Sequence, residues 1–350
     1  MSKSRQEKLG LWANQVLKQL LPKIKGEADL TLVSGDASFR RYFRVRTDGA
    51  HFIAVDAPPE HENSRIFVRV CNLLQDAGVT APKVFSADYD QGFMLLDDFG
   101  DEIYLNRLVD LQESGNQSEI NTLYESAIDS LLGIQAGVDK EILDPYGKSE
   151  LHREMSLFED WFCSQFLQLK LEENEKALIA ETLEFLGEAA LSQPQVAVHR
   201  DYHSRNLMIL DIKEFGENCT PGIIDFQDAV SGPYTYDLVS LLRDAYIRWD
   251  QELVDGWALY YLEQAKSSRL IENIEEAQFL RDFDLMGLQR QLKVIGIFAR
   301  LCIRDNKPRY LADIPLVIQY FLEVGQKYTE LKAFVDWFKH AVEPIARNKL

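Results

Sequence analysis

Two stretches decide the fold of this chain: VAVHRDYHSRNLMIL at residues 196–210 and IIDF at residues 223–226. In the first, apolar strand-like runs flank a polar loop that holds Asp201 and, five residues later, Asn206. In the second, Asp225 follows a third apolar run. Phosphoryl transfer from a nucleotide needs a carboxylate that accepts the proton of the attacking hydroxyl and oxygen ligands that hold Mg²⁺. The three side chains therefore predict a metal and phosphate site.

The roles of these three residues follow from their chemistry. Asp201 is the predicted general base. Asn206 and Asp225 are the predicted Mg²⁺ ligands, with Asp225 bridging oxygens of the β- and γ-phosphates. We expect a hairpin to close the loop, because it would bring Asp201 and Asn206 to one point while Asp225 reaches that point from the side. The alternative is a polar β-turn with solvated acids.

Composition places the chain among globular proteins. Its 350 residues and hydrophobic content of 46% allow a full core and two lobes. A net charge of -18 argues against a nucleic-acid partner, since neutralising phosphates needs a basic face. The four cysteines form no C-x-x-C pair, which favours a reduced compartment over a zinc site or a disulfide framework.

The sequence also bears on location. The apolar residues among the first 21 recur at helical spacing, which predicts a surface helix rather than a signal peptide. No apolar run approaches the roughly 20 residues of a membrane span. We therefore predict a cytoplasmic monomer with no membrane partner.

The order of predicted elements indicates an α+β fold. Strands are predicted near residues 30–33, 39–45, 51–56, 84–87 and 93–96, with a helix over residues 64–77 that ends at Gly78. Most of the chain after a junction at residues 96–100 has a helical pattern. We predict a small antiparallel sheet lobe with one helix at residues 1–96, and a larger, mostly helical lobe at residues 97–350.

The order of elements resembles the protein-kinase-like fold. The run from His199 to Asn206 matches the H-x-D-x-H-x-x-N signature of the aminoglycoside phosphotransferase and choline kinase branch. Further stretches are similar to bacterial cell-wall amino-sugar kinases: residues 34–42, 55–58, 225–229, 232–233 and 236–238. The resemblance implies a kinase that uses ATP and Mg²⁺ to phosphorylate the anomeric hydroxyl of N-acetylmuramate or N-acetylglucosamine in peptidoglycan recycling.

The nucleotide contacts are predicted from a loop and from the resemblance. Small residues between two strands let backbone N–H groups approach phosphates, and the resemblance places the backbone of the inter-lobe hinge against adenine. The predicted contacts are Ser34, Gly35, Ser38, Arg40, Leu96 and Asp97. The alternative for Arg40 is a solvated position on an edge strand.

One position departs from the kinase pattern. The third strand of a kinase offers a lysine to the α- and β-phosphates, paired with a glutamate of the next helix. This chain has Asp56 there, and the next helix carries Arg65 and Arg69 but no central glutamate. A carboxylate cannot attract phosphate. We expect Arg40, Arg41 or Arg69 to supply the positive charge, unless metal and backbone hold the nucleotide.

The acceptor is predicted to be a small molecule. Only six residues separate Asp225 from Gly232, and no A-P-E follows, whereas a protein kinase needs a longer activation segment. The predicted substrate contacts are Asp201, His203 and Arg243. His199 and His203 are also expected to hold Asp201 through loop hydrogen bonds. Asp237 is expected to cap a helix or to support the catalytic loop.

Two other functions fit the same sequence. An aminoglycoside, choline or other amino-alcohol kinase would make use of the acidic surface. A pseudokinase scaffold would explain the missing third-strand lysine. Against a scaffold stand Asp201, Asn206 and Asp225, which a binding module has no chemical reason to need.

Overall fold

The computed structural model describes residues 4–22, 29–34, 39–47, 49–216 and 221–350. The chain divides into two compact units, one of residues 1–103 with 206–227 and the other of residues 104–205 with 228–350. It therefore returns to the first unit for a short segment around Asn206 and Asp225. The predicted lobes, 1–96 and 97–350, are continuous in sequence and do not include such a return of the chain. They stay a prediction.

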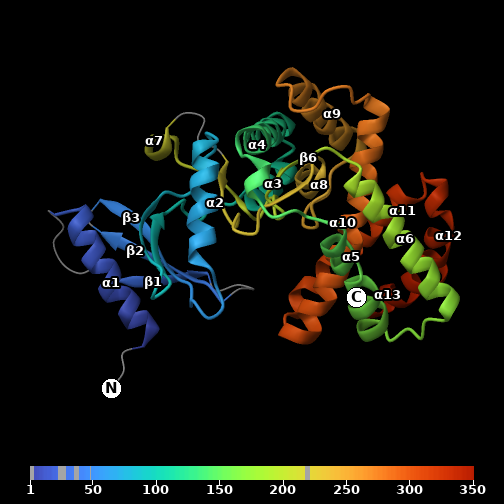
Figure 1. Ribbon diagram of the computed structural model, residues 1–350, viewed down its shortest axis with the longest axis horizontal. Helices are drawn as coiled ribbons and strands as arrows, with labels where there is room; N and C mark the ends of the chain where they lie inside the picture. The colour runs from blue at the N-terminus through green and yellow to red at the C-terminus, as the bar shows by residue number, and fades with distance from the viewer. Residues whose placement is uncertain (1–3, 23–28, 35–38, 48, 217–220) are drawn as a thin grey trace. The chain divides into compact units, whose positions relative to one another are not determined.

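The first unit is built on a five-stranded antiparallel sheet (Figure 1) in the order β1-β2-β3-β5-β4. The strands are β1 Leu30–Ser34, β2 Arg41–Thr47, β3 Ala50–Asp56, β4 Val84–Asp88 and β5 Phe93–Asp97. Ala54 lies opposite both Phe43 and Leu95, and all three side chains are buried. Because alternate residues of a strand share a face, these strands present one apolar layer. The predicted strands are confirmed.

Two long helices belong to this unit, α1 Arg5–Leu20 and α2 Ser64–Asp76. Helix α1 begins with a capping box, in which the amide of Glu7 donates to Ser4 Oγ at 3.2 Å. Its residues Leu9 and Val16 pack against the apolar layer of the sheet, and Figure 1 shows the helix along the strands. Gly78, at φ 79°, follows the end of α2 as its position predicts.

The second unit is mostly helical, as predicted. Its longer elements are α3 Tyr104–Ser114, α4 Gln117–Gly137, α5 Lys148–Met155, the π-helical segment η2 Phe158–Phe166, α6 Glu173–Leu191, α8 Tyr236–Leu242, α9 Gln251–Ser267, α10 Glu276–Asp305, α11 Ile314–Gly325, α12 Lys332–Trp337 and α13 Glu343–Lys349. Residues 282–293 of α10 are all buried, so this helix forms the centre of the unit. A side chain at Gly296 would meet the backbone of Leu157 at 2.4 Å, so glycine permits α10 to pack closely on η2.

The remaining strands correct one expectation. Strand β6 Gln195–Val198 pairs with β9 Val230–Pro233, and β7 Leu207–Met208 pairs with β8 Gly222–Ile223. The expected hairpin across the loop between β6 and β7 is therefore wrong. Each strand belongs to a different compact unit and satisfies its backbone groups with a partner from its own unit. Within the described part of the chain, no helix has the length and apolar character to span a bilayer.

Candidate active site

The first unit brings the two predicted metal ligands together. Asn206 stands directly before β7 and Asp225 stands two residues after β8. The Ile224 amide donates to the Asn206 carbonyl at 3.1 Å. Asn206 Nδ2 lies 3.4 Å from Asp225 Oδ2, and Gln227 Nε2 donates to Asp225 Oδ1 at 3.0 Å. Two amides therefore orient one exposed carboxylate.

The backbone at Asp225 is unusual. Its φ is 65°, in the left-handed region that residues with a Cβ adopt rarely. The next residue, Phe226, is buried, and its ring centroid lies 4.9 Å from that of Phe67 in α2. Packing of Phe226 holds this turn, and strained positions of this kind cluster at functional sites. The turn thus presents the Asp225 carboxylate to solvent.

The donor set of Asn206 and Asp225 fits Mg²⁺. Magnesium takes oxygen ligands, keeps several waters and is bound through one or two protein groups together with substrate phosphates. Asn206 offers an amide oxygen and Asp225 a carboxylate, which is the number of protein ligands that such a site needs. Among the residues that the structure describes, no cluster of three or more His, Cys, Asp or Glu is placed to hold a metal by itself.

A buried ion pair lies in the same unit. Arg40 Nη2 is 2.8 Å from Glu62 Oε2, and the two side chains are only 7% and 11% exposed. The Phe39 amide donates to the other oxygen of Glu62 at 3.2 Å. Arg40 also hydrogen-bonds the hydroxyl of Tyr42; burial first, and then the negative charge of Asp225, raises the pKa of that hydroxyl. Arg40 is therefore a buried cation, and the solvated edge position is wrong.

Asp56 has a different role. Its buried carboxylate accepts hydrogen bonds from Arg5 Nη2 and from Arg41 Nη2, both at 2.5 Å. Arg5 also donates to the Gln91 carbonyl at 2.8 Å. Asp56 thus ties α1 to the sheet. Of the arginines proposed to replace the third-strand lysine, Arg41 is engaged by this carboxylate.

The structure describes only some of the other predicted nucleotide contacts. Gly35 and Ser38 lie outside the described residues, and Ser34 ends β1. Leu96 is buried in β5. The Asp97 amide donates to the Lys83 carbonyl at 3.0 Å, so a backbone bond from Asp97 to adenine would use its carbonyl oxygen.

The second unit holds the loop that carries Asp201. The loop leaves β6 at His199, and Arg200 has φ 78°. Asp237 of α8 accepts from the amides of His199, at 2.6 Å, and of Arg200, at 3.0 Å. Burial raises the pKa of Asp237, although these hydrogen bonds oppose the rise. Thr235 occupies the N-cap position of α8, so Asp237 supports the catalytic loop and does not cap the helix.

The electrostatics suit Asp201 to the role of a base. Burial alone would raise the pKa of this partly buried carboxyl, but nearby positive groups outweigh burial and lower the pKa. The strongest is Lys293 of α10, followed by His203, His199 and Arg200. The carboxylate is therefore ionised at neutral pH and able to accept a proton.

Two supporting residues were missed from the sequence. Ser204 donates its amide to Asp244 Oδ2 at 3.0 Å and its hydroxyl to the same oxygen. Asp244 lies two residues after Leu242, the last residue of α8, so no helical spacing pointed to it. Lys293 gave only a weak signal, because a lysine in a helical pattern normally indicates a solvated face.

The predicted substrate residues differ in whether their side chains already bind other residues of the protein. The Asp201 amide donates to His199 Nδ1 at 3.3 Å, which confirms one loop bond. His203 packs its ring edge-on against Tyr246, and within the described chain its buried Nδ1 has no hydrogen-bond partner. Arg243 Nη2 binds Asp284 Oδ1 at 2.5 Å in the buried core. A contact of Arg243 with a substrate therefore has to compete with Asp284.

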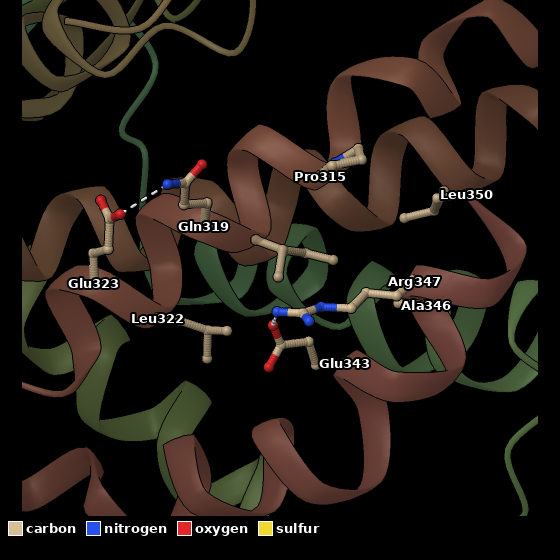
Figure 2. A pocket seen from close by; sticks show the side chains of 9 residues that line it. Pro315, Gln319, Leu322, Glu323, Glu343, Ala346, Arg347 and Leu350 are labelled. Atoms are coloured by element: carbon tan, nitrogen blue, oxygen red, sulfur yellow. Dashed lines mark hydrogen bonds and ion pairs between the residues drawn. The ribbon is translucent and has the colours of Figure 1, made fainter.

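A hollow elsewhere in the second unit holds none of these residues (Figure 2). It measures about 430 Å³ and lies between α11 and α13. Its charged side chains already have partners, Glu343 with Arg347 at 2.6 Å, and Glu323 with Arg248 at 3.0 Å and Gln319 at 2.9 Å. Such a site offers no free charge for a phosphate, and we assign it no part in the chemistry.

Comparison with known proteins shows the sequence family of this chain. A model of the phosphotransferase enzyme family matches residues 29–277. The chain is also 41% identical, over 331 residues, to the N-acetylmuramate/N-acetylglucosamine kinase of Pseudomonas putida. This match covers 93% of the chain and 94% of the relative.

Solved structures show the fold. The ethanolamine kinase of Plasmodium vivax superposes with a TM-score of 0.61 at 11% identity, over 98% of this chain and 90% of that one. An ADP-bound aminoglycoside phosphotransferase gives a TM-score of 0.56 at 15% identity, over 89% and 97%. The protein-kinase-like fold predicted from the sequence is confirmed.

Proposed function

Because the chain belongs to the phosphotransferase enzyme family, we propose that it is an ATP-dependent kinase that phosphorylates the anomeric hydroxyl of N-acetylmuramate and N-acetylglucosamine. The observation that carries this proposal is the 41% identity, over 93% of the chain, to a kinase named for these two sugars. The site geometry supports the chemistry, since it supplies an ionised carboxylate and an oriented pair of metal ligands. The product would enter the recycling of peptidoglycan.

Asp201 is the proposed base. Its carboxylate accepts the proton of the sugar hydroxyl as that oxygen attacks the γ-phosphorus and the bond from this phosphorus to the departing ADP breaks. The bonds from Asp237 to two loop amides fix the backbone on its N-terminal side, and Asp244 holds Ser204 on the other side. The loop thereby fixes the direction in which the acceptor hydroxyl is held. His203, with one ring nitrogen not engaged by a described residue, is the proposed second contact to the acceptor.

Asn206 and Asp225 are the proposed ligands of Mg²⁺. The ion, when bound with ATP, neutralises charge on the phosphate oxygens. Gln227 keeps the Asp225 carboxylate in place through its hydrogen bond. The nucleotide contacts of Ser34, Gly35, Ser38, Leu96 and Asp97 stay part of the proposal, as does the substrate contact of Arg243.

Arg40 is the proposed cation of the nucleotide site. Its partner Glu62 orients the guanidinium, while Tyr42 connects it to the charge of Asp225 within the same unit. An arginine fork suits phosphate oxygens better than a point charge does. The pair would take the place of the lysine and glutamate of other kinases.

We also propose that the protein acts as a cytoplasmic monomer. The described cysteines Cys71, Cys163 and Cys302 are free thiols, as expected in a reducing compartment. Light scattering during size-exclusion chromatography tests the monomer directly.

An acceptor panel tests the function. The protein is incubated with γ-labelled ATP, Mg²⁺ and, separately, N-acetylmuramate, N-acetylglucosamine, an aminoglycoside and choline. The proposal expects label in the two amino sugars and none in the others. Label in the aminoglycoside or choline alone would replace it with the amino-alcohol kinase, and no label in any acceptor would favour a scaffold.

A further inference from the structure

A cluster of charged and phenolic groups is buried in the second unit. Lys293 of α10 lies with its Nζ 2.8 Å from Glu154 Oε2 of α5. The same Nζ donates to the Tyr236 hydroxyl of α8 at 2.7 Å. The side chains of Lys293 and Glu154 are only 7% and 6% exposed. Three helices therefore meet at one buried ammonium group.

Glu154 connects this ammonium group to the catalytic loop. Its Oε1 accepts from the Arg200 guanidinium, and its Oε2 accepts from the Tyr146 hydroxyl. Arg200 also lies over the Tyr146 ring, 5.3 Å from its centroid. Arg200 immediately precedes Asp201 in the chain. The carboxylate of Glu154 thus holds both Lys293 and the residue next to the proposed base.

The charges of this cluster do not balance without Asp201. Two cations, Lys293 and Arg200, share the single carboxylate of Glu154, and the more exposed Arg153 lies 3.8 Å from it. Although burial opposes its ionised form, these two cations lower the pKa of Glu154, so it carries a full negative charge. Positive charge therefore exceeds negative charge around Glu154, and a buried charge is costly unless it has a counter-charge. Both cations interact electrostatically with Asp201.

We infer that Lys293 is a positioning residue, fixed by Glu154 and Tyr236, whose charge holds the Asp201 carboxylate for the attack of the acceptor hydroxyl. This inference rests on the proposed function and adds to it the residue that governs the base. Lys293 need not touch the sugar or the nucleotide. A purely structural role would explain its bonds to Glu154 and Tyr236, but it would not explain why Lys293 is the strongest of the positive charges that favour the ionised form of Asp201.

Other charged groups near the cluster complete the electrostatic setting. The groups that face Asp201 are Lys293 from α10 and His203, His199 and Arg200 from its own loop. The groups that face Lys293 are Tyr236 of α8, Glu154 of α5, Arg200 and Asp201, together with Tyr146, whose ring centroid lies 5.8 Å from the ammonium nitrogen. Arg290, one turn before Lys293, lies 4.6 Å from the centroid of the Tyr236 ring and adds a further cation.

The test compares the pH dependence of kcat in Lys293→Met and in the parent. Without the ammonium charge the pKa of Asp201 rises, because an opposite charge no longer favours its ionised form. The acid limb of the profile should move to higher pH by about one unit, and kcat should fall about tenfold or more. Binding of ATP, measured by calorimetry, should not change. The matched control is Lys332→Met, an exposed lysine of α12, which should leave both unchanged.

Two further variants keep the inference testable if Lys293→Met folds poorly. Lys293→Arg keeps the charge and should keep the acid limb in place, even where kcat falls. Lys293→Gln removes the charge but keeps an amide that can donate to Glu154 or Tyr236, and it should show the shifted limb. An unshifted limb with an undiminished kcat, in whichever of Lys293→Met and Lys293→Gln folds, would overturn the inference.

A parallel measurement separates this inference from the function on which it rests. If Asp201→Asn is inactive while loss of the Lys293 charge changes nothing, only the role of Lys293 is lost. If Asp201→Asn is as active as the parent, the proposed base is wrong, and the role of Lys293 falls with it.

Discussion

The guanidinium of Arg40 and the carboxylate of Glu62 form a buried ion pair, with Nη2 2.8 Å from Oε2. Arg40 directly precedes β2 and Glu62 stands just before α2. Other kinases place a lysine on the third strand and a glutamate on the next helix. Here the third-strand residue Asp56 is occupied by Arg5 and Arg41. The missing lysine is therefore no evidence for a scaffold, because a different pair supplies a fixed cation in the same unit.

Replacing Arg40 tests its role toward the nucleotide. We expect Arg40→Met to raise the Kd for ATP about tenfold or more, because a charge-assisted hydrogen bond to phosphate contributes roughly 1.5–3 kcal/mol. Calorimetry with ATP and Mg²⁺ measures this. Arg46→Met, at an exposed arginine of β2, is the matched control. Equal ATP affinity of Arg40→Met and the control would show that Arg40 serves the fold alone.

Reversing the charge at Asp56 tests the departure from the kinase pattern. A lysine at this buried position would face two arginines, and leaving buried charges without a partner typically costs about 3–5 kcal/mol. We discount this figure because Arg5 and Arg41 are 36% and 42% exposed, so that water screens them. Asp56→Lys should lower Tm without improving ATP affinity. Tighter ATP binding at an unchanged Tm would contradict the structural role of Asp56 and would mean that this position contacts the nucleotide.

Removing the charge of Asp225 tests the metal site. Asp225→Asn keeps the shape but weakens the attraction for a divalent ion. We expect the half-saturating Mg²⁺ concentration to rise about tenfold or more. Mutation of even a residue that only hydrogen-bonds a metal ligand typically lowers metal affinity about 10–100-fold. Titration of activity with Mg²⁺ measures this, and Asp228→Asn, at an exposed neighbouring position, is the control. Identical titrations for Asp225→Asn and the parent would exclude Asp225 as a ligand.

Replacing Asp237 tests whether this residue supports the catalytic loop. Its two oxygens accept from the amides of His199 and Arg200, whereas asparagine has only one acceptor oxygen. Asp237→Asn therefore leaves one buried amide facing an N–H group, at a cost of about 1–3 kcal/mol. Thermal unfolding should show a lower Tm, and kcat should fall with it. Asp110→Asn, on the exposed face of α3, should change neither quantity.

Much of the first unit could be predicted because its signals are local. Alternating apolar residues marked β2 and β3, and the glycine after α2 marked where that helix ends. The pairing of β6 with β9 could not be predicted, since the two strands are distant in sequence and β7 was the nearer partner. A short polar loop between two apolar runs looks like a hairpin whichever strands it joins.

The site was predictable where chemistry requires a residue type, as at Asp201, Asn206 and Asp225. It was not predictable where packing decides. Lys293 and Arg243 look like surface residues of amphipathic helices, yet both are buried with carboxylate partners. Glu62 precedes its helix, outside the segment in which a kinase-like glutamate is expected. Partners of this kind depend on which elements meet in three dimensions.

The most direct test of the proposed chemistry is the conversion of N-acetylmuramate by the parent and by Asp201→Asn, followed by phosphorus NMR with ATP and Mg²⁺. The parent should yield a sugar 1-phosphate. Asp201→Asn should bind ATP as the parent does but turn over at least about 10² more slowly, the scale of general base catalysis. Equal rates in the two proteins, or a parent that consumes ATP without a phosphorylated sugar, would contradict the assignment of Asp201 as the base of an amino-sugar kinase.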